Sequence, residues 1–158
     1  HKNLQLKNRV VMAPLTRSRA TNIENKPVEE LHVEYYKQRA SAGLIITEGS
    51  QVSKDAVGYV NTPGIYSKAQ VEGWKKVTKA VHEEGGKIFI QLWHVGRMSH
   101  PDFHNGKLPL APSALNPNAQ SYTPEGFKDT VTPKAMTKED IKQTIADFVN
   151  AAKNAVEA

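Results

Sequence analysis

The 158-residue sequence contains no cysteine. This absence excludes disulfides, thiolate metal sites, Cys-ligated iron–sulfur clusters and thiol catalysis from this stretch of chain. The sequence also lacks any apolar run near the roughly 20 residues that a membrane helix needs, and residues 1–7 lack the apolar centre of a signal peptide. The expectation is a soluble, cytoplasmic protein that has no membrane partner.

Basic charge is present but not concentrated. The formal net charge is +5, from 21 Lys and Arg against 16 Asp and Glu. Nucleic-acid binding relies on clustered basic residues that contact phosphates. Here acidic residues are interleaved with the basic ones along the predicted helices, as in Glu72, Lys75, Lys76, Lys79, Glu83 and Glu84. This pattern is typical of a solvated helix face, so the sequence predicts no nucleic-acid partner.

Several common site motifs are missing as well. The sequence contains no G-x-G-x-x-G, G-x-x-x-x-G-K-[ST], H-E-x-x-H or G-x-S-x-G, which argues against Rossmann, P-loop, zincin and α/β-hydrolase chemistry. Four residues, His94, His100, Asp102 and His104, suggest a metal cluster at first sight. Their spacing matches no common ligand set, so we expect no metal site.

What the sequence does contain is a repeated design of apolar runs that end in a polar residue or a glycine. The runs are residues 8–17, 43–49 and 87–93, and each is typical of a buried strand. Thr16, the Glu48-Gly49 pair and Gln91 lie at or near their C-terminal ends. Active sites of α/β sheets and barrels lie at those ends of the strands.

Helical patterns separate and follow these runs. The first is expected to begin near Pro27 and to carry Leu31, Tyr35, Tyr36 and Ala40 before Gly43. The second has a capping box at Ser67 and Gln70, a stop at Gly85-Gly86, and an inward stripe of Val71, Trp74, Val77, Thr78 and Val81. The last opens with Thr137 and Asp140 and has an apolar face of Ile141, Ile145, Phe148, Val149, Ala152 and Val156.

A long, proline-rich stretch, residues 96–133, lies between the third strand and the last helix. It shows little periodicity and is expected to form a large loop excursion with a small hairpin of its own. A functional lid and a plain surface insertion are equally compatible with this pattern.

The resulting order, β-α-β-α-β-loop-α, favours an α/β fold with a parallel sheet covered by helices. Three strands do not complete such a fold, because a (β/α)8 TIM barrel takes roughly 250 residues. We therefore expect residues 1–158 to form the N-terminal part of a single TIM-barrel domain. This part comprises its first three β/α units and the excursion after strand three.

Each candidate site residue has a structural alternative. Thr16 is either a ligand contact or a capping hydroxyl of a strand-ending turn. Gln91 offers a donor and an acceptor to a ring edge, or it is a core amide satisfied by the backbone. Gly49 either allows close approach of a ligand or forms a tight turn. Tyr59 and Trp93 either wall a cavity or simply pack.

Taken together, these segments resemble the old yellow enzyme family of flavin-dependent ene-reductases. The matching segments follow one another at family spacing and are residues 8–17, 35–49, 58–59, 63–65 and 91–97. With Thr16, the chain resembles the branch of the family that has threonine rather than cysteine at this position.

The resemblance implies an NAD(P)H-dependent oxidoreductase with FMN as its cofactor and NADPH or NADH as its reductant. The hydride would go to the β-carbon of a small activated alkene, an α,β-unsaturated carbonyl compound or a nitroalkene. It further implies that Ala13, Pro14 and Leu15 line the flavin. Thr16 would bond and tune the flavin, Gly49 would contact it through the backbone, and Gln91 would pair with its pyrimidine edge. Tyr59 and Trp93 would shape the substrate pocket.

The resemblance also implies that the His/Asn or His/His pair and the tyrosine acid of the family lie outside this chain. An alternative is a non-catalytic half-barrel that needs the remaining part of the barrel as a complementary chain. A third hypothesis, another phosphate- or flavin-binding barrel such as an aldolase, requires a Schiff-base lysine on the following strand.

Overall fold

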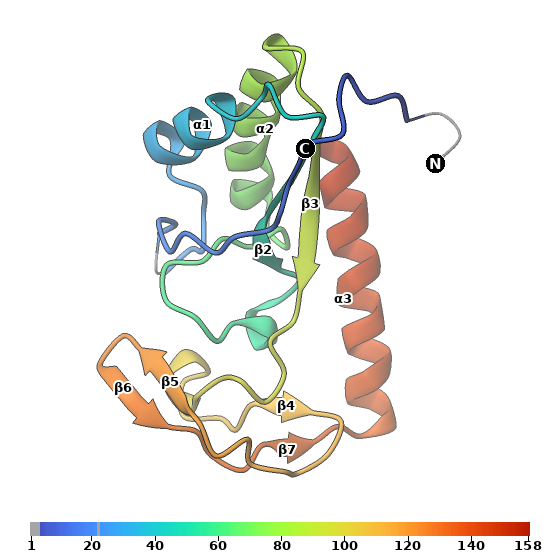
Figure 1. Ribbon diagram of the computed structural model, residues 1–158. Helices are drawn as coiled ribbons and strands as arrows, with labels where there is room; N and C mark the ends of the chain where they lie inside the picture. The colour runs from blue at the N-terminus through green and yellow to red at the C-terminus, as the bar shows by residue number, and fades with distance from the viewer. Residues whose placement is uncertain (1–3, 22) are drawn as a thin grey trace.

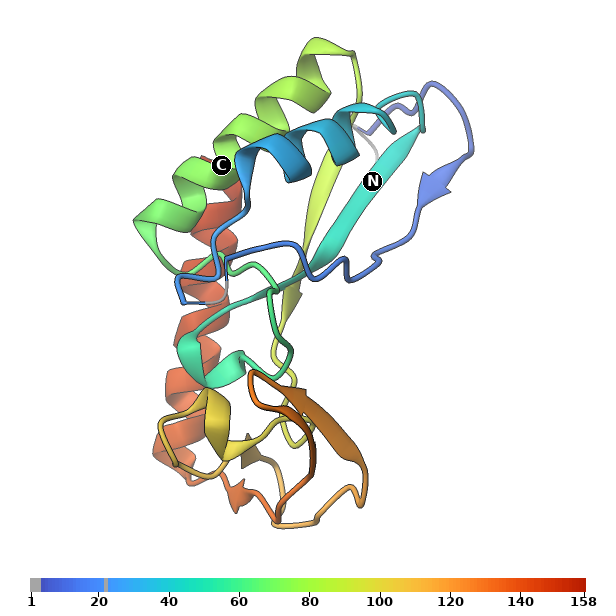
Figure 2. The ribbon, with the colours of Figure 1, turned by 90° about the vertical axis from the view of Figure 1, so that its left-hand side faces the viewer.

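The computed structural model describes residues 4–21 and 23–158, and it is built around a parallel sheet (Figure 1). The sheet has three strands in the order β1 (Val11–Met12), β2 (Leu44–Gln51) and β3 (Ile88–Trp93). Helices α1 (Glu29–Lys37) and α2 (Lys68–Glu83) follow β1 and β2 and lie together on one side of the sheet (Figure 2). The predicted β-α-β-α-β order is therefore confirmed.

Two strands differ in length from the prediction. Only Val11 and Met12 of the first apolar run pair with β2. The run passes through Pro14, which has no N–H to donate to a ladder, so the segment after Met12 leaves the sheet. The second strand instead continues past Gly49 to Gln51, with a shift in register between Ile46 and Gly49. Such a bulge bends a strand and redirects its side chains.

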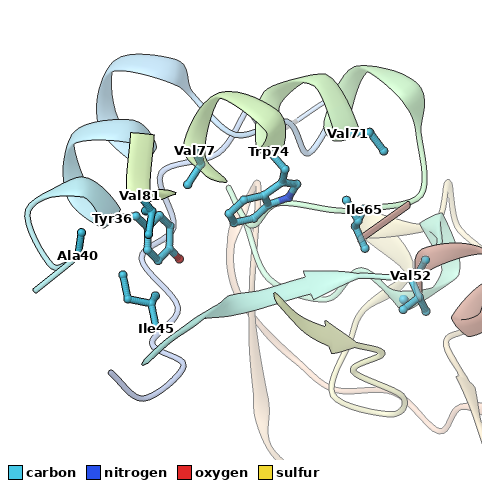
Figure 3. Close-up of a cluster of buried hydrophobic side chains, with 11 residues drawn as sticks. Tyr36, Ala40, Ile45, Val52, Ile65, Val71, Trp74, Val77 and Val81 are labelled. Atoms are coloured by element: carbon cyan, nitrogen blue, oxygen red, sulfur yellow. The ribbon is translucent and has the colours of Figure 1, made fainter. Parts of the chain in front are cut away.

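One face of the sheet packs on the helices and forms the core. Met12, Ile45, Ile88, Ile90 and Leu92 lie on this face. They pack in a cluster with Tyr36, Ala40, Trp74, Val77 and Val81 (Figure 3). Because side chains alternate along a strand, the residues between them project from the opposite face. That second face is not covered by α1 or α2.

Helix α2 forms as predicted, and the α1 segment buries Tyr36 and Ala40 as expected but leaves Leu31 exposed. In α2, the Ser67 hydroxyl accepts from the Gln70 backbone N–H and the full capping box is present. Helix α1 begins at Glu29, close to the predicted start near Pro27, but Leu31 is 50% exposed. His32 is buried in its place because the ring bonds the backbone of Val28 and packs edge-on against Trp74.

Helix α3 (Lys138–Glu157) starts with the predicted Thr137–Asp140 capping box. Its apolar face is largely uncovered within the described residues, however. Ile141, Ile145, Val149 and Val156 are exposed, and contact with the core comes from Phe148 and Ala151. The one fully buried residue of α3, Ala151, is not part of the predicted stripe, so the face that is covered depends on the neighbouring elements and not on periodicity alone.

The excursion after β3 lies beyond the carboxyl end of that strand (Figure 1). It contains a 3-10 turn at Pro101–Phe103 and the predicted hairpin, formed by β5 (Gln120–Thr123) and β6 (Gly126–Asp129). Two further short strands, β4 (Leu110–Ala111) and β7 (Lys134–Ala135), pair in parallel. A second 3-10 turn, Lys54–Ala56, follows β2. In the described part of the chain, every helix is too short or too polar to cross a membrane.

Candidate functional site

The uncovered face of the sheet brings two of the predicted site residues side by side. Gly49 of β2 and Gln91 of β3 are paired in the parallel ladder, so they share a face. On β3, Ile90 and Leu92 point into the helix-covered core, so Gln91 and Trp93 point the other way. Phe89 shares this face and is 54% exposed. The result is an open, mainly apolar surface with one amide in it.

Gln91 is available for a ligand. Its side chain is exposed, and its carboxamide has no hydrogen-bond partner among residues 4–21 and 23–158. Its backbone N–H donates to the Thr47 hydroxyl at 3.3 Å, which ties β3 to the bulge of β2. Within the described residues, the carboxamide is therefore not satisfied by the backbone.

Gly49 lies within β2 and against an aromatic ring, so the alternative of a tight turn is wrong. A Cβ at this position would lie 2.5 Å from Trp93 Cε3, well inside van der Waals contact. The indole of Trp93 therefore needs glycine here. Tyr59 stacks on Trp93, with the two ring centroids 5.1 Å apart and an interplanar angle of 28°. The two rings therefore pack on each other next to Gly49, and their part in walling a cavity stays a prediction.

The segment of residues 13–16 follows β1 without joining the sheet. Ala13, Leu15 and Thr16 are exposed, and Pro14 is half-buried. The Thr16 hydroxyl has no hydrogen-bond partner in the described ranges, so it does not cap a turn. The next residue, Arg17, donates its backbone N–H to Glu48 Oε2 at 3.2 Å. This bond holds the segment next to the residue that precedes Gly49.

Sequence reasoning missed the role of Glu48, which it treated only as the end of a strand. Glu48 is buried behind the sheet, where its Oε1 accepts from the Tyr36 hydroxyl at 3.1 Å and lies 3.5 Å from His32 Nε2. A signal was available, because a glutamate inside an apolar strand is rarely buried without partners. The identity of those partners could not be read from the sequence.

The histidines of the excursion form local contacts. His100 Nδ1 lies 3.1 Å from Asp102 Oδ1, and His104 Nε2 lies 2.9 Å from the Ser99 hydroxyl. His94 Nδ1 accepts from the Gly96 backbone N–H at 3.0 Å. Within the described ranges, no three His, Asp or Glu side chains are grouped so that they could hold a metal ion.

We expect His104 to contribute to acid sensitivity. Burial lowers the pKa of His104 below its ordinary value of about 6.5. The unfolded chain therefore binds more protons below that pH, and stability falls as the pH decreases through this window. In chemical denaturation from pH 7.5 to 5, His104→Gln should show a shallower loss of stability than the parent protein. An unchanged slope would contradict the assignment, and the exposed His82→Gln is the control.

Comparison with known proteins decides the family. The model of the NADH:flavin oxidoreductase / NADH oxidase family matches residues 1–158. The chain belongs to this family. It is 45% identical to flavin oxidoreductase hxnT of Emericella nidulans over 97% of this chain and 40% of that protein. The resemblance to old yellow enzyme seen in the sequence is confirmed.

Solved structures of family members agree with this assignment. The old yellow enzyme homologue from Zymomonas mobilis superposes with a TM-score of 0.91 at 45% identity, covering 96% of this chain and 42% of that one. Morphinone reductase in complex with tetrahydroNAD gives a TM-score of 0.88 at 47% identity, covering 97% and 43%. The chain thus spans about two fifths of the length of these relatives. Its unclosed sheet is part of a TIM barrel.

The surface fits the flavin that this family uses. An isoalloxazine is flat and has apolar and polar edges. It fits against a surface whose backbone it can approach closely. Gly49 has no side chain, so a ring can approach its backbone. Gln91 offers an amide and Thr16 a hydroxyl, and neither group is hydrogen-bonded to another described residue. A donor–acceptor amide beside a glycine, on an exposed apolar face, suits the edge of such a ring.

Proposed function

We propose that this family member is the N-terminal part of an NAD(P)H-dependent FMN ene-reductase of the old yellow enzyme type. In this proposal residues 1–158 belong to a single barrel domain and form one side of its flavin site. The observation that carries the proposal is the pairing of Gly49 with Gln91 on the uncovered face of the sheet, at its carboxyl end.

Each residue of this surface has a proposed role. Ala13, Pro14 and Leu15 line the ring, and the Thr16 hydroxyl bonds and tunes it. The backbone of Gly49 contacts the ring, and the Gln91 amide pairs with its pyrimidine edge. FMN, when bound, supplies the hydride chemistry that links NADPH or NADH to the β-carbon of an activated alkene. Trp93 and Tyr59, stacked at 5.1 Å, shape the adjoining substrate pocket.

The remaining part of the barrel, contiguous with this chain or a separate chain, supplies the pair that binds the substrate carbonyl and the tyrosine acid. Within residues 4–21 and 23–158, no strand pairs with the outer edge of β3, and the apolar stripe on α3 is exposed; both observations support this need for further structure. Membership of the NADH:flavin oxidoreductase / NADH oxidase family supports NADH as a reductant, and NADPH is proposed as the alternative reductant. We propose the cytoplasm as its location.

The direct test uses the complete barrel protein that contains this chain. We expect the purified protein to carry a yellow chromophore that is released as FMN, and to oxidise NAD(P)H in the presence of 2-cyclohexenone. Residues 1–158 expressed alone should do neither. A complete protein that neither binds FMN nor reduces the enone would overturn the proposal.

Removing the Gln91 amide should weaken FMN binding. In the complete protein, Gln91→Ala deletes up to two hydrogen bonds to the ring edge, so we expect the Kd for FMN to rise about tenfold. Fluorescence titration of the apoprotein with FMN measures this change. The matched control is Gln120→Ala, an exposed glutamine of the β5–β6 hairpin that bonds Asp129. Equal FMN affinity in the two variants would remove Gln91 from the site.

A further inference from the structure

A buried carboxylate lies directly behind the proposed flavin surface. Glu48 is 1% exposed and belongs to the bulge of β2, one residue before Gly49. Burying a carboxylate is costly unless it is hydrogen-bonded, so its partners decide whether it is tolerated. Its two oxygens are used separately: Oε1 faces helix α1, and Oε2 faces the segment after β1.

Tyr36 of α1 holds Glu48 at two points. The phenolic oxygen accepts from the Glu48 backbone N–H at 2.9 Å, and the same hydroxyl donates to Glu48 Oε1 at 3.1 Å. Figure 3 shows Tyr36 reaching from α1 toward β2, with its oxygen nearest the strand. Burial raises the pKa of Tyr36 far above its usual range, so the group remains an O–H donor. Backbone and side chain of Glu48 are therefore oriented together.

His32, one helical turn earlier, faces the same carboxylate. Its Nδ1 lies 3.0 Å from the Val28 backbone N–H, and its Nε2 lies 3.5 Å from Glu48 Oε1. Nδ1 also lies 3.1 Å from the Val28 carbonyl oxygen, and Nε2 has no hydrogen-bond partner within the described residues. The ring stands edge-on to Trp74, with centroids 6.2 Å apart. Glu48 Oε1 is thus enclosed by two groups of a packed helix.

The other oxygen, Oε2, acts on the segment that carries Thr16. The N–H that it accepts, at 3.2 Å, belongs to the peptide that joins Thr16 to Arg17. This segment lies outside the β1–β2 ladder, which ends at Met12. Its position relative to Gly49 therefore depends on the Glu48 carboxylate. A small cavity of about 170 Å³ adjoins this contact and is lined by Arg17, Arg19, Leu31, His32, Tyr35 and Glu48.

We propose that Glu48 is a positioning residue for the flavin site: braced by Tyr36 and His32, it fixes the Thr16–Arg17 peptide and so sets where the Thr16 hydroxyl lies relative to Gly49. The proposal rests on the proposed function, because it assigns Glu48 an effect that passes through Thr16. A carboxylate is suited to this task, since its two oxygens accept from two donors on different elements at once. A carboxamide offers one oxygen and turns its NH2 group toward the other donor.

The test is a double-mutant cycle in the complete, FMN-saturated holoenzyme. The variants are Glu48→Gln, Thr16→Val and the double variant. Tyr36→Phe keeps the Glu48 carboxylate but removes the hydroxyl that bonds it. The control is Glu34→Gln, which makes the same change as Glu48→Gln at an exposed position of α1. The readouts are the rate of flavin reduction by NAD(P)H, the flavin reduction potential and the visible spectrum.

We expect Glu48→Gln and Thr16→Val each to slow flavin reduction about tenfold and to shift the potential in the same direction. The double variant should reduce its flavin no more slowly than Thr16→Val, because both substitutions remove the same effect of the Thr16 hydroxyl on the flavin. Tyr36→Phe should shift the potential in that same direction, and Glu34→Gln should not. Tyr36→Phe keeps the proposal testable if Glu48→Gln does not fold.

Two results would overturn the inference, and they are distinguishable. In the first, Thr16→Val changes the rate of flavin reduction and the reduction potential, but Glu48→Gln and Tyr36→Phe behave like Glu34→Gln. The carboxylate then only stabilises the fold. If Thr16→Val itself leaves rate and potential unchanged, the Thr16 assignment within the proposed function fails, and the positioning role fails with it. FMN binding and enone reduction by the parent protein test the proposed function separately.

Discussion

We expect Gly49→Ala to lower the FMN affinity of the complete protein more than any other single change considered above. The added methyl group would lie 2.5 Å from Cε3 and 2.8 Å from Cδ2 of Trp93. The indole must move, which disturbs its stack with Tyr59, and the methyl group itself projects into the face proposed to hold the flavin. A shape change of this kind at a close backbone approach should raise the Kd for FMN about a hundredfold.

Titration of the apoprotein with FMN measures this effect, with Gly73→Ala as the control. Gly73 lies in α2, away from the uncovered face, where alanine improves helix propensity by up to about 1 kcal/mol. Its new Cβ meets Pro27 Cδ at 3.1 Å, a contact that requires only a slight adjustment. If Gly49→Ala and Gly73→Ala bind FMN equally well, the flavin does not lie against Gly49.

Trp74→Ala is expected to have the largest effect on stability. Trp74 of α2 is 1% exposed and packs in the core cluster, where its Nε1–H donates to the Gly64 carbonyl at 3.1 Å. Its ring packs against Tyr36, with centroids 6.0 Å apart. Deleting it leaves a cavity and an unpaired carbonyl, and truncation of a core tryptophan costs about 3 to 5 kcal/mol.

Urea denaturation of the complete protein, followed by circular dichroism, gives this difference. The control is Phe127→Ala on the β5–β6 hairpin, because Phe127 is 71% exposed and should change stability by about 0.5 kcal/mol or less. A loss below 1 kcal/mol for Trp74→Ala would show that the cluster in Figure 3 does not hold α2 to the sheet.

Local patterns determined much of the fold. The capping boxes of α2 and α3 need only residues three apart, and both are present. The apolar stripe of α2 is buried as its periodicity predicts. The order of strands and helices, the hairpin in the excursion and the family membership were also readable from the sequence. The caps, stripes and turns depend on residues that are close together in the chain. The family membership was indicated by the order and spacing of the matching segments.

The site was readable in part for the same reason. Thr16, Gly49 and Gln91 come at the ends of apolar runs, and parallel strands bring such ends to one edge. That Gly49 and Gln91 are paired follows from the register of the ladder, which includes a shift within β2. The hydrophobic periodicity of one strand cannot show a bulge, because a bulge is an extra residue relative to the partner strand with which it pairs.

The remaining features were decided by tertiary structure alone. The first strand contributes only two ladder residues, and α1 buries His32 instead of Leu31 because Trp74 and Glu48 lie opposite it. The Glu48 carboxylate meets Tyr36 and Arg17, which are 12 and 31 residues away in the chain. Helical period and strand alternation are properties of neighbouring residues, whereas a buried charge is stabilised by whichever donors folding brings to it. The sequence by itself therefore determined the elements, their order and the family, and the packed structure determined how the Thr16 segment is held beside Gly49.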